Sequence, residues 1–392
     1  MKKQNGIGYA WVILLVVCLA NFTPSFAQYQ MSPIAGELIE RFSLNKSQFA
    51  SIFSAPMIPS IFLSLASGLL VDKFGAKKVI AIGLIIASIG ISGRLFATSY
   101  ETLLIPMILA GFSATFLNAN GAKILGSWFQ AEKVSMVMGI SLASSTIGMT
   151  VGLSTTALFP EIKTAFMAAS MLSVITLIVW LLFMKESKGL KEQSETIPMK
   201  ECIRRVVKNK TIWIVALCLM FTMGCNVTIS TFLPAVLNAK GVDVSLAGAM
   251  SALVTVGNLC GSIFAPMIAV KFKNNRVFIF SLGLCAAVFT ILAGRIPVGM
   301  GLTLCLFIVG VSIGGLIPSL LSLPILLPEI GPKYAGTAGG VIGTIELLGA
   351  VVIPTYVIAP LAKSNEWLFL LAGLCIAFVC ICSIFLPKYE RN

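Results

Sequence analysis

The sequence contains no histidine and few charged residues of either sign. Only 11% of its 392 residues are charged, whereas 57% are hydrophobic, and the mean hydropathy is +0.98. A soluble domain carries about 25% charged residues because its surface must face water. This shortage of charge excludes an ordinary soluble domain and indicates a surface that faces lipid. The absence of histidine removes the commonest general base, which argues against an enzyme.

Motifs for metals, disulfides and nucleotides are missing as well. The cysteines lie within apolar runs, except Cys202, which lies in a charged stretch. Without CxxC pairs, zinc sites and a disulfide framework are poor interpretations, and we expect the cysteines to be packing residues. No phosphate-binding loop of the GxxxxGK[ST] type occurs, so energy should come from an ion or solute gradient. We therefore expect no metal, no cofactor and no enzymatic activity.

Long apolar runs dominate what is present. A membrane-spanning helix needs about 20 mostly apolar residues. No alternation with a period of two suggests a β-barrel. The sequence therefore predicts an all-α integral membrane protein with twelve transmembrane helices. Their expected ranges are residues 9–30, 47–71, 79–97, 102–126, 134–157, 164–184, 211–236, 245–270, 277–294, 298–323, 335–361 and 366–386.

The basic residues predict how the chain is threaded. The formal net charge is +13, from 28 Lys and Arg against 15 Asp and Glu. With the N-terminus inside, 21 of these 28 bases fall on the inner side, as the positive-inside rule requires. We expect a multi-pass protein of the cell membrane with both termini in the cytoplasm, in contact with lipid and not with nucleic acid. The basic start and apolar run mimic a secretion signal, but the run continues past Ala27, so we expect an uncleaved first helix.

Landmarks recur at an offset of about 200 residues, which indicates an internal repeat. The recurring pairs are Trp11 and Trp213, Gly93-Arg94 and Gly294-Arg295, and Lys133 and Lys333. We expect two pseudo-symmetric six-helix bundles, residues 1–184 and 211–392. The polar residues 185–210 would form a cytoplasmic linker with room for a short surface helix. Parallel repeats of this kind are one of the known transporter architectures.

A motif follows the second predicted span. Its residues are Gly68, Asp72, Lys73, Gly75, Lys77 and Lys78. In order and spacing it resembles the loop 2–3 motif of the major facilitator superfamily, and the two six-helix halves extend the resemblance over the whole chain. The resemblance implies a secondary transporter, with Asp72 and Gly75 in a gate latch that holds one conformation. The alternative is a solvated, topogenic loop.

The physical logic of this motif is local. Asp72 can pair with a base or a helix N-terminus in one conformation only. We expect Gly68 to allow a close helix approach and Gly75 to allow a tight turn. In the second half, residues 270–276 have valine in place of the acid, so we expect that latch to be lost.

Two further stretches resemble the cyanate-permease and nitrate-porter-like branches of this superfamily. One ends the fourth span, with Asn118, Asn120 and Lys123, the last of these expected at the inner interface. The other is the glycine-rich segment 336–343, whose small-xxx-small spacing predicts close helix packing. These branches point to a small anion. Spans two and eight contain no Lys or Arg, however, so a neutral or cationic solute fits equally well.

Glu346 is the best candidate for a functional charge in the bilayer. It lies 13 residues past Lys333, about 20 Å deep at 1.5 Å per residue. Desolvation disfavours a charged carboxylate there, so we expect a proton, a basic partner or a cationic substrate group. A structural, hydrogen-bonded glutamate is the alternative.

Other polar groups lie within predicted spans. The resemblance implies that spans one, four, seven and ten line the cavity, although each of these residues could equally bond helices together. The candidates for the substrate or proton pathway are Asn21, Gln28, Tyr29, Asn118, Asn120, Asn226, Ser319 and Glu346. Arg94 and Arg295 lie near outer helix ends. We expect their side chains to reach the outer interface, with an outer gate for anions as the alternative.

The sequence therefore predicts a monomeric secondary active transporter of a small polar organic solute, which could be a small anion, by alternating access. We expect coupling to protons or another ion, by symport or antiport. One alternative is an exporter of a cationic or amphipathic compound. A non-transporting membrane sensor is the alternative of another class, although the loops are too short for a signalling domain.

Overall fold

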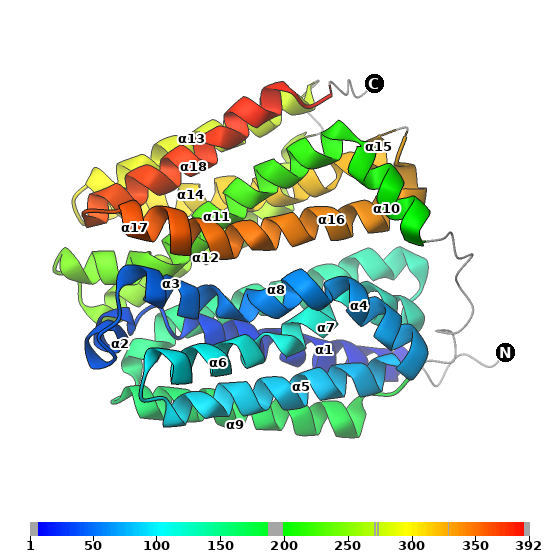
Figure 1. Cartoon of the computed structure of the whole chain (residues 1–392), viewed down its shortest axis with the longest axis horizontal. Coiled ribbons are helices and arrows are strands. Elements are labelled where there is room, and N and C mark those ends of the chain that lie inside the picture. The colour runs from blue at the N-terminus through cyan, green and yellow to red at the C-terminus, as the bar shows by residue number, and fades with distance from the viewer. Residues whose placement is uncertain (1–6, 187–198, 270–271, 273, 328, 388–392) are drawn as a thin grey trace. The chain divides into compact units, whose positions relative to one another are not determined.

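Helices make up most of the computed structural model, which describes residues 7–186, 199–269, 272, 274–327 and 329–387 (Figure 1). Within these residues, eleven helices are long and apolar enough to cross a membrane. A bent pair, Lys46–Ser64 and Ala66–Phe74, with an angle of 65° between its parts, makes a twelfth span if the two parts are counted together. The predicted all-α fold with twelve membrane helices is confirmed.

The chain divides into two compact units. The first contains residues 1–34 and 55–195, and the second contains residues 35–54 and 196–392. Of the predicted linker, residues 187–198 lie outside the described part. The first unit comprises α1 (Ile7–Tyr29), α4 (Ile58–Phe74), α5 (Ala76–Gly93), α6 (Tyr100–Ala110), α7 (Phe112–Trp128), α8 (Ala131–Thr155) and α9 (Ile162–Phe183), with 3-10 turns at Ala55–Met57, Arg94–Phe96 and Thr156–Leu158.

The second unit has the same succession of spans. It also contains α2 and α3, which come from the first half of the sequence. Its helices are α2 (Ala35–Arg41), α3 (Lys46–Ser54), α10 (Met199–Lys208), α11 (Lys210–Ala239), α12 (Val244–Ala269), α13 (Asn275–Arg295), α14 (Met300–Leu321), α15 (Leu323–Leu326), α16 (Gly331–Val352), α17 (Ala359–Leu361) and α18 (Asn365–Ile384), with a π-helical turn at Ile353–Ile358.

The two units repeat one packing scheme. In the first, α1 packs on α8 and α9, α4 packs on α7, and α5 packs on α7 and α9. In the second, α11 packs on α16 and α18, α12 packs on α14, and α13 packs on α14 and α18. Each contact recurs between the corresponding spans, so the offset of about 200 residues reflects a structural repeat.

Glycines set the closest helix contacts, at positions that the sequence analysis did not select. On α12 and α14, a Cβ at Gly257, Gly261, Gly310 or Gly314 would overlap with backbone atoms of the facing helix. Such small residues let two backbones approach directly. In segment 336–343, no atom lies within 4 Å of a Cβ at Gly336, Gly339 or Gly343, so these three glycines do not make the predicted close helix contact.

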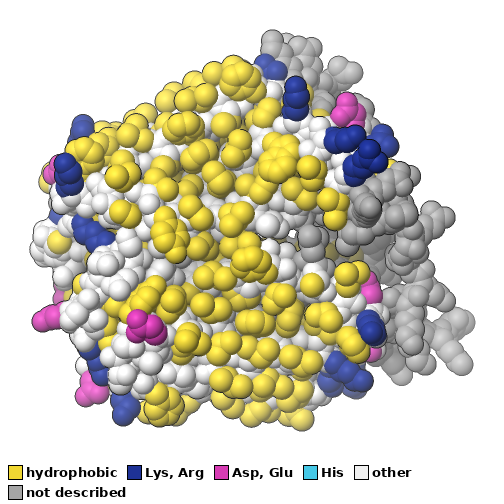
Figure 2. All heavy atoms as spheres, in the orientation of Figure 1, with side chains coloured by type: hydrophobic (Ala, Val, Ile, Leu, Met, Phe, Trp, Pro, Cys, Tyr) yellow, Lys and Arg dark blue, Asp and Glu magenta, His cyan; other side chains and the backbone are white. Residues whose placement is uncertain are grey.

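The outer surface of the helices is apolar. Large side chains such as Phe62, Phe96 and Met300 are 75%, 80% and 76% exposed. Figure 2 shows hydrophobic side chains spread over the helix flanks, with Lys and Arg gathered towards helix ends. Contiguous exposed apolar surface of this extent is expected only where lipid is the solvent.

Candidate functional site

Glu346 lies near the middle of α16. Its side chain is only 9% exposed. At 1.5 Å per residue, Glu346 lies about 22 Å along the helix axis from the first residue of α16. Among the described residues the only ion pair joins Asp72 to Lys123, so no described base neutralises Glu346. Burying an uncompensated carboxylate is costly, which suits this group to bind and release a proton.

Several glycines precede Glu346 on α16, among them Gly336, Gly339 and Gly343. Gly339, Gly343 and Glu346 are separated by four and three residues, which places them on one side of the helix. The space beside Gly336, Gly339 and Gly343 is open. A Cβ at any of these three glycines would therefore contact no atom outside α16 itself.

Two asparagines meet between α11 and α12. Asn258 donates from Nδ2 to Oδ1 of Asn226 over 3.2 Å, and Asn226 in turn donates to the Met223 sulfur at 3.9 Å. Both side chains are only partly buried, so they keep room for a further polar contact. Asn226 was a predicted pathway residue, whereas Asn258 was not, although it too is an amide within an otherwise apolar span.

The asparagines of the first unit bond helices together. Asn21 on α1 donates to the Ser141 hydroxyl of α8 at 2.8 Å. Asn120 on α7 donates to the Ser67 hydroxyl of α4 at 2.7 Å, and both asparagines are buried. These hydrogen bonds fit the alternative that both asparagines join helices together. A role of either residue in the transport pathway stays a prediction. Of the other candidates, Tyr29 is buried, Gln28 is half-buried and Asn118 is exposed.

The loop 2–3 motif forms a turn and an ion pair. Gly75 separates α4 from α5 with φ at +89°, in the left-handed region, so the predicted tight turn is confirmed. Asp72 at the end of α4 pairs with Lys123 of α7. Lys123 therefore tethers two neighbouring helix ends, which the sequence analysis did not foresee. The side chains of Lys73 and Lys78 are exposed.

The two glycines of this motif, Gly68 and Gly75, have different surroundings. No atom lies within 4 Å of a Cβ at Gly68, so the predicted close helix approach there is wrong. At Gly75, a Cβ would overlap with the carboxylate of Glu186, which lies just beyond α9. Trp180 of α9 also donates to the Lys77 carbonyl at 3.1 Å. The end of α9 therefore packs over the start of α5, a contact that no local sequence pattern indicates.

Arg94 is buried inside the first unit. It is 2% exposed, and its Nη1 donates to the Ala27 carbonyl at 2.7 Å. Its guanidinium lies 4.5 Å from the centre of the Phe166 ring. The prediction that this side chain reaches the outer interface is wrong. Ala27 is in the last turn of α1, where carbonyls lack helical partners and the helix dipole favours a cation. Arg295 is exposed, and its position at the outer interface stays a prediction.

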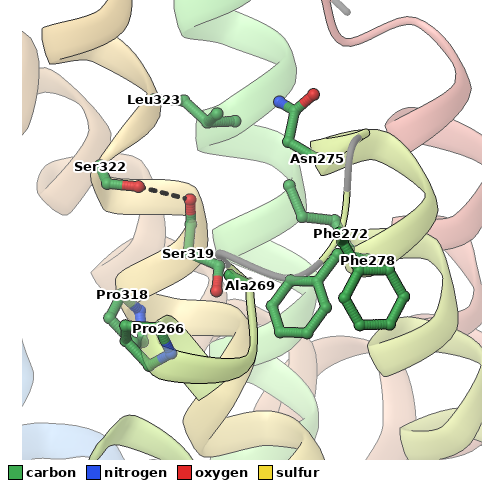
Figure 3. A pocket seen from close by; sticks show the side chains of 10 residues that line it. Pro266, Ala269, Phe272, Asn275, Phe278, Pro318, Ser319, Ser322 and Leu323 are labelled. Atoms are coloured by element: carbon green, nitrogen blue, oxygen red, sulfur yellow. Dashed lines mark hydrogen bonds between the residues drawn. The ribbon is translucent and has the colours of Figure 1, made fainter. Parts of the chain in front are cut away.

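Ser319 lines a small cavity at the end of α14 (Figure 3). The cavity measures about 140 Å³ and lies between the ends of α12, α13 and α14. Ser322 donates to the Ser319 carbonyl at 2.9 Å. Phe272 and Phe278 form one wall, with ring centres 5.0 Å apart. This volume is below the ~300 Å³ of an ordinary ligand pocket, so the cavity suits water or a very small solute.

The segment before α4 packs within the second unit. Lys46 at the start of α3 donates to the Ala362 carbonyl at 3.3 Å. Phe49 is fully buried and lies 6.3 Å from the Phe232 ring of α11. α3 also contacts the π-helical turn Ile353–Ile358, a feature that often marks functional sites. The sequence predicted this segment only as the start of span two.

The described residues form eleven apolar spans and one bent pair in two repeated units, with polar groups inside them, and this arrangement is that of a multi-pass membrane transporter. In the described residues, no group of three or more Cys, Asp or Glu side chains is arranged to hold a metal ion. A family model described as Major Facilitator Superfamily matches residues 12–354. The chain belongs to this superfamily and is a secondary transporter, as the loop 2–3 motif predicted.

Several curated relatives are similar over most of their length. The 4-hydroxybenzoate transporter PcaK of Acinetobacter baylyi is 20% identical, over 84% of this chain and 80% of its own. The probable sulfoacetate transporter SauU of Cupriavidus necator is 23% identical, over 96% and 93%. The cyanate transport protein CynX of Escherichia coli is 22% identical, over 83% of each chain. The predicted likeness to the cyanate-permease branch is therefore confirmed.

Solved structures share the fold. A bacterial homolog of the human lysosomal transporter Spinster, inward-facing and occupied, has a TM-score of 0.78, with 14% identity over 96% of each chain. A D-xylose-proton symporter has a TM-score of 0.77, with 15% identity over 97% of this chain and 98% of its own. At these identities the likeness establishes the fold alone.

Proposed function

We propose that this protein moves a small polar organic solute across the cell membrane by alternating access, coupled to proton movement through Glu346. The observation that carries the proposal is the position of this buried carboxylate, which has no described base and lies at the end of the open glycine face of α16. A carboxylate there can hold a proton in one stage of the cycle and release it in another.

The relatives suggest which solutes to test. They are named for transport of 4-hydroxybenzoate, sulfoacetate and cyanate, which are all small anions. A protonated Glu346 could donate a hydrogen bond to such an anion, and the Asn226–Asn258 pair offers further polar contacts. This supports symport of a small anion or polar acid with protons.

A second candidate is export of a cationic or amphipathic compound. The acid at position 346 has no described basic partner, and a cationic group of a substrate would neutralise it. Proton antiport would then follow from competition between the proton and the cation for one carboxylate.

We assign gating roles to two contacts. The Asp72–Lys123 pair joins α4 to α7 at the predicted cytoplasmic ends, and we assign it the role of the inner latch. At the outer ends, we assign a gate to α3, through the Lys46 bond to Ala362 and the contact between Phe49 and Phe232.

The coupling role is tested by Glu346→Gln in proteoliposomes that contain a pH-sensitive dye. After addition of 4-hydroxybenzoate, sulfoacetate or cyanate, the unmodified protein should produce solute-driven proton uptake. Glu346→Gln should abolish the proton signal, because the amide binds no proton at neutral pH. Glu366→Gln, which removes an exposed acid at the start of α18, serves as the control. Unchanged proton movement in Glu346→Gln would rule out this carboxylate as the coupling group.

A further inference from the structure

The helix before α11 has one face buried in the second unit. α10 contains Cys202 and Val206, which are 8% and 0% exposed and lie one turn apart. α10 contacts α16, and Arg205 fixes it there through a bond from Nε to the Glu329 carbonyl at 3.2 Å. Arg205 also lies 5.2 Å from the centre of the Tyr334 ring. α10 is therefore a docked element of fixed orientation.

A second, apolar surface of α10 is exposed. Ile203 and Val207, also one turn apart, are 36% and 40% exposed. Trp213 continues this surface, because it is 43% exposed and its Nε1 donates to the Val207 carbonyl at 2.8 Å. Trp213 lies in the first turn of a membrane span, the position at which tryptophan marks the lipid headgroup layer. The hydrogen bond places the end of α10 at that same level.

Basic side chains flank this apolar surface. Arg204 and Lys208 each follow one of the exposed apolar residues by one position, and Lys210 begins α11. All three are exposed, and in the described part of the chain none of them forms an ion pair. Figure 1 shows that α10 turns sharply away from α11, so it lies across the ends of the spanning helices and not along them.

We propose that α10 is an interfacial helix that binds anionic lipid headgroups of the inner leaflet. Ile203, Val207 and Trp213 would enter the boundary between headgroups and acyl chains, while Arg204, Lys208 and Lys210 contact lipid phosphates. An exposed apolar pair beside bases, next to an interfacial tryptophan, is the pattern of a helix that lies in the membrane surface. The charge selects anionic over zwitterionic lipid. The proposal uses the cytoplasmic side proposed for this end but no property of the transported solute.

The test is the affinity of the purified full-length protein for fluorescent phosphatidylglycerol in mixed micelles, compared with fluorescent phosphatidylcholine. Removing one base near the surface should weaken anionic binding about fivefold, so Arg204→Gln/Lys208→Gln should weaken it about 25-fold. Binding of phosphatidylcholine should not change. The matched control, Lys163→Gln/Lys363→Gln, removes two exposed bases from the predicted outer side and should leave both affinities unchanged.

Added salt and substitutions in the apolar surface test the proposal independently through the same lipid affinities. Added salt should weaken phosphatidylglycerol binding by the unmodified protein much more than by Arg204→Gln/Lys208→Gln, because salt screens exposed charges. Ile203→Ser/Val207→Ser should weaken binding of both lipids. Equal affinity of the unmodified protein for the two lipids, or an equal loss in the control variant, would overturn the proposal.

Discussion

At the scale of single residues, Arg94 shows how an ionic side chain can be buried without a carboxylate. Its guanidinium has the Ala27 carbonyl, the carboxyl end of α1 and the face of Phe166 as partners. A helix C-terminus and an aromatic face each stabilise a cation. Within this guanidinium, Nη2 has no described hydrogen-bond partner. Arg94 thus connects the end of α1 to α5 and α9.

This role predicts a loss of stability in Arg94→Met. The substitution keeps an apolar stem but leaves the Ala27 carbonyl buried without its donor, at a cost of about 1–3 kcal/mol. We expect a lower midpoint of thermal unfolding in detergent. Arg295→Met, at the repeat-related but exposed position, should leave the midpoint unchanged. Equal midpoints for the two variants would show that Arg94 contributes no structural contact.

The contacts of single residues were the features that the sequence predicted least well. Glu346 and Asp72 could be found because each is a rare acid in or beside an apolar run. The burial of Arg94 could not, because its partners are a backbone carbonyl and a ring from distant segments. The partner of Asp72 was missed for a similar reason, since Lys123 lies on a helix that only the fold brings near.

At the scale of elements, the α12–α14 contact depends on four glycines facing one another's backbones. The spacing of Gly257 and Gly261, and of Gly310 and Gly314, is the same small-xxx-small spacing that occurs in segment 336–343. The spacing predicts a face on which two helices can meet, but a partner must also be present. Twelve spans and their repeat could be predicted from hydropathy and landmarks, whereas the choice of facing helices required the three-dimensional packing.

A matched pair of substitutions separates these two glycine faces. Gly261→Ala should destabilise the protein, because its Cβ would overlap with the Val311 carbonyl of α14. Gly339→Ala meets open space and gains up to about 1 kcal/mol of helix propensity, so it should be neutral or stabilising. Thermal unfolding in detergent measures both. Equal destabilisation by the two variants would contradict the observed faces.

At the scale of the whole molecule, the Asp72–Lys123 pair should matter for transport more than for stability. Its side chains are 57% and 37% exposed, and an exposed pair contributes only about 0–1 kcal/mol. We expect Asp72→Asn to leave thermal unfolding nearly unchanged but to slow solute uptake into proteoliposomes. Lys73→Gln, at the next position of α4, is the control. Unchanged uptake in Asp72→Asn would favour the alternative of a solvated, topogenic loop.

The charge distribution predicts the threading of the entire chain. Because most of the bases are assigned to one side, reporter tags at the two termini should both be protected from the outside of intact cells. Tags inserted after Lys240 or Lys363, on the predicted outer side, should be accessible. If only one terminus reacts from outside, the number of crossings is odd; if both react, the chain is threaded the other way.

The placement of α2 and α3 has a consequence for how the molecule holds together. The polypeptide enters the second unit at residue 35, returns at residue 55 and enters it again after residue 195. After a protease cut within residues 187–198, the two fragments should therefore stay bound to each other without a covalent link. The first fragment would keep α3, whose Phe49 and Phe53 are fully buried and belong to the second unit. The two fragments should copurify after cleavage. The first half expressed alone should aggregate, because the buried side chains of α3 would then be exposed.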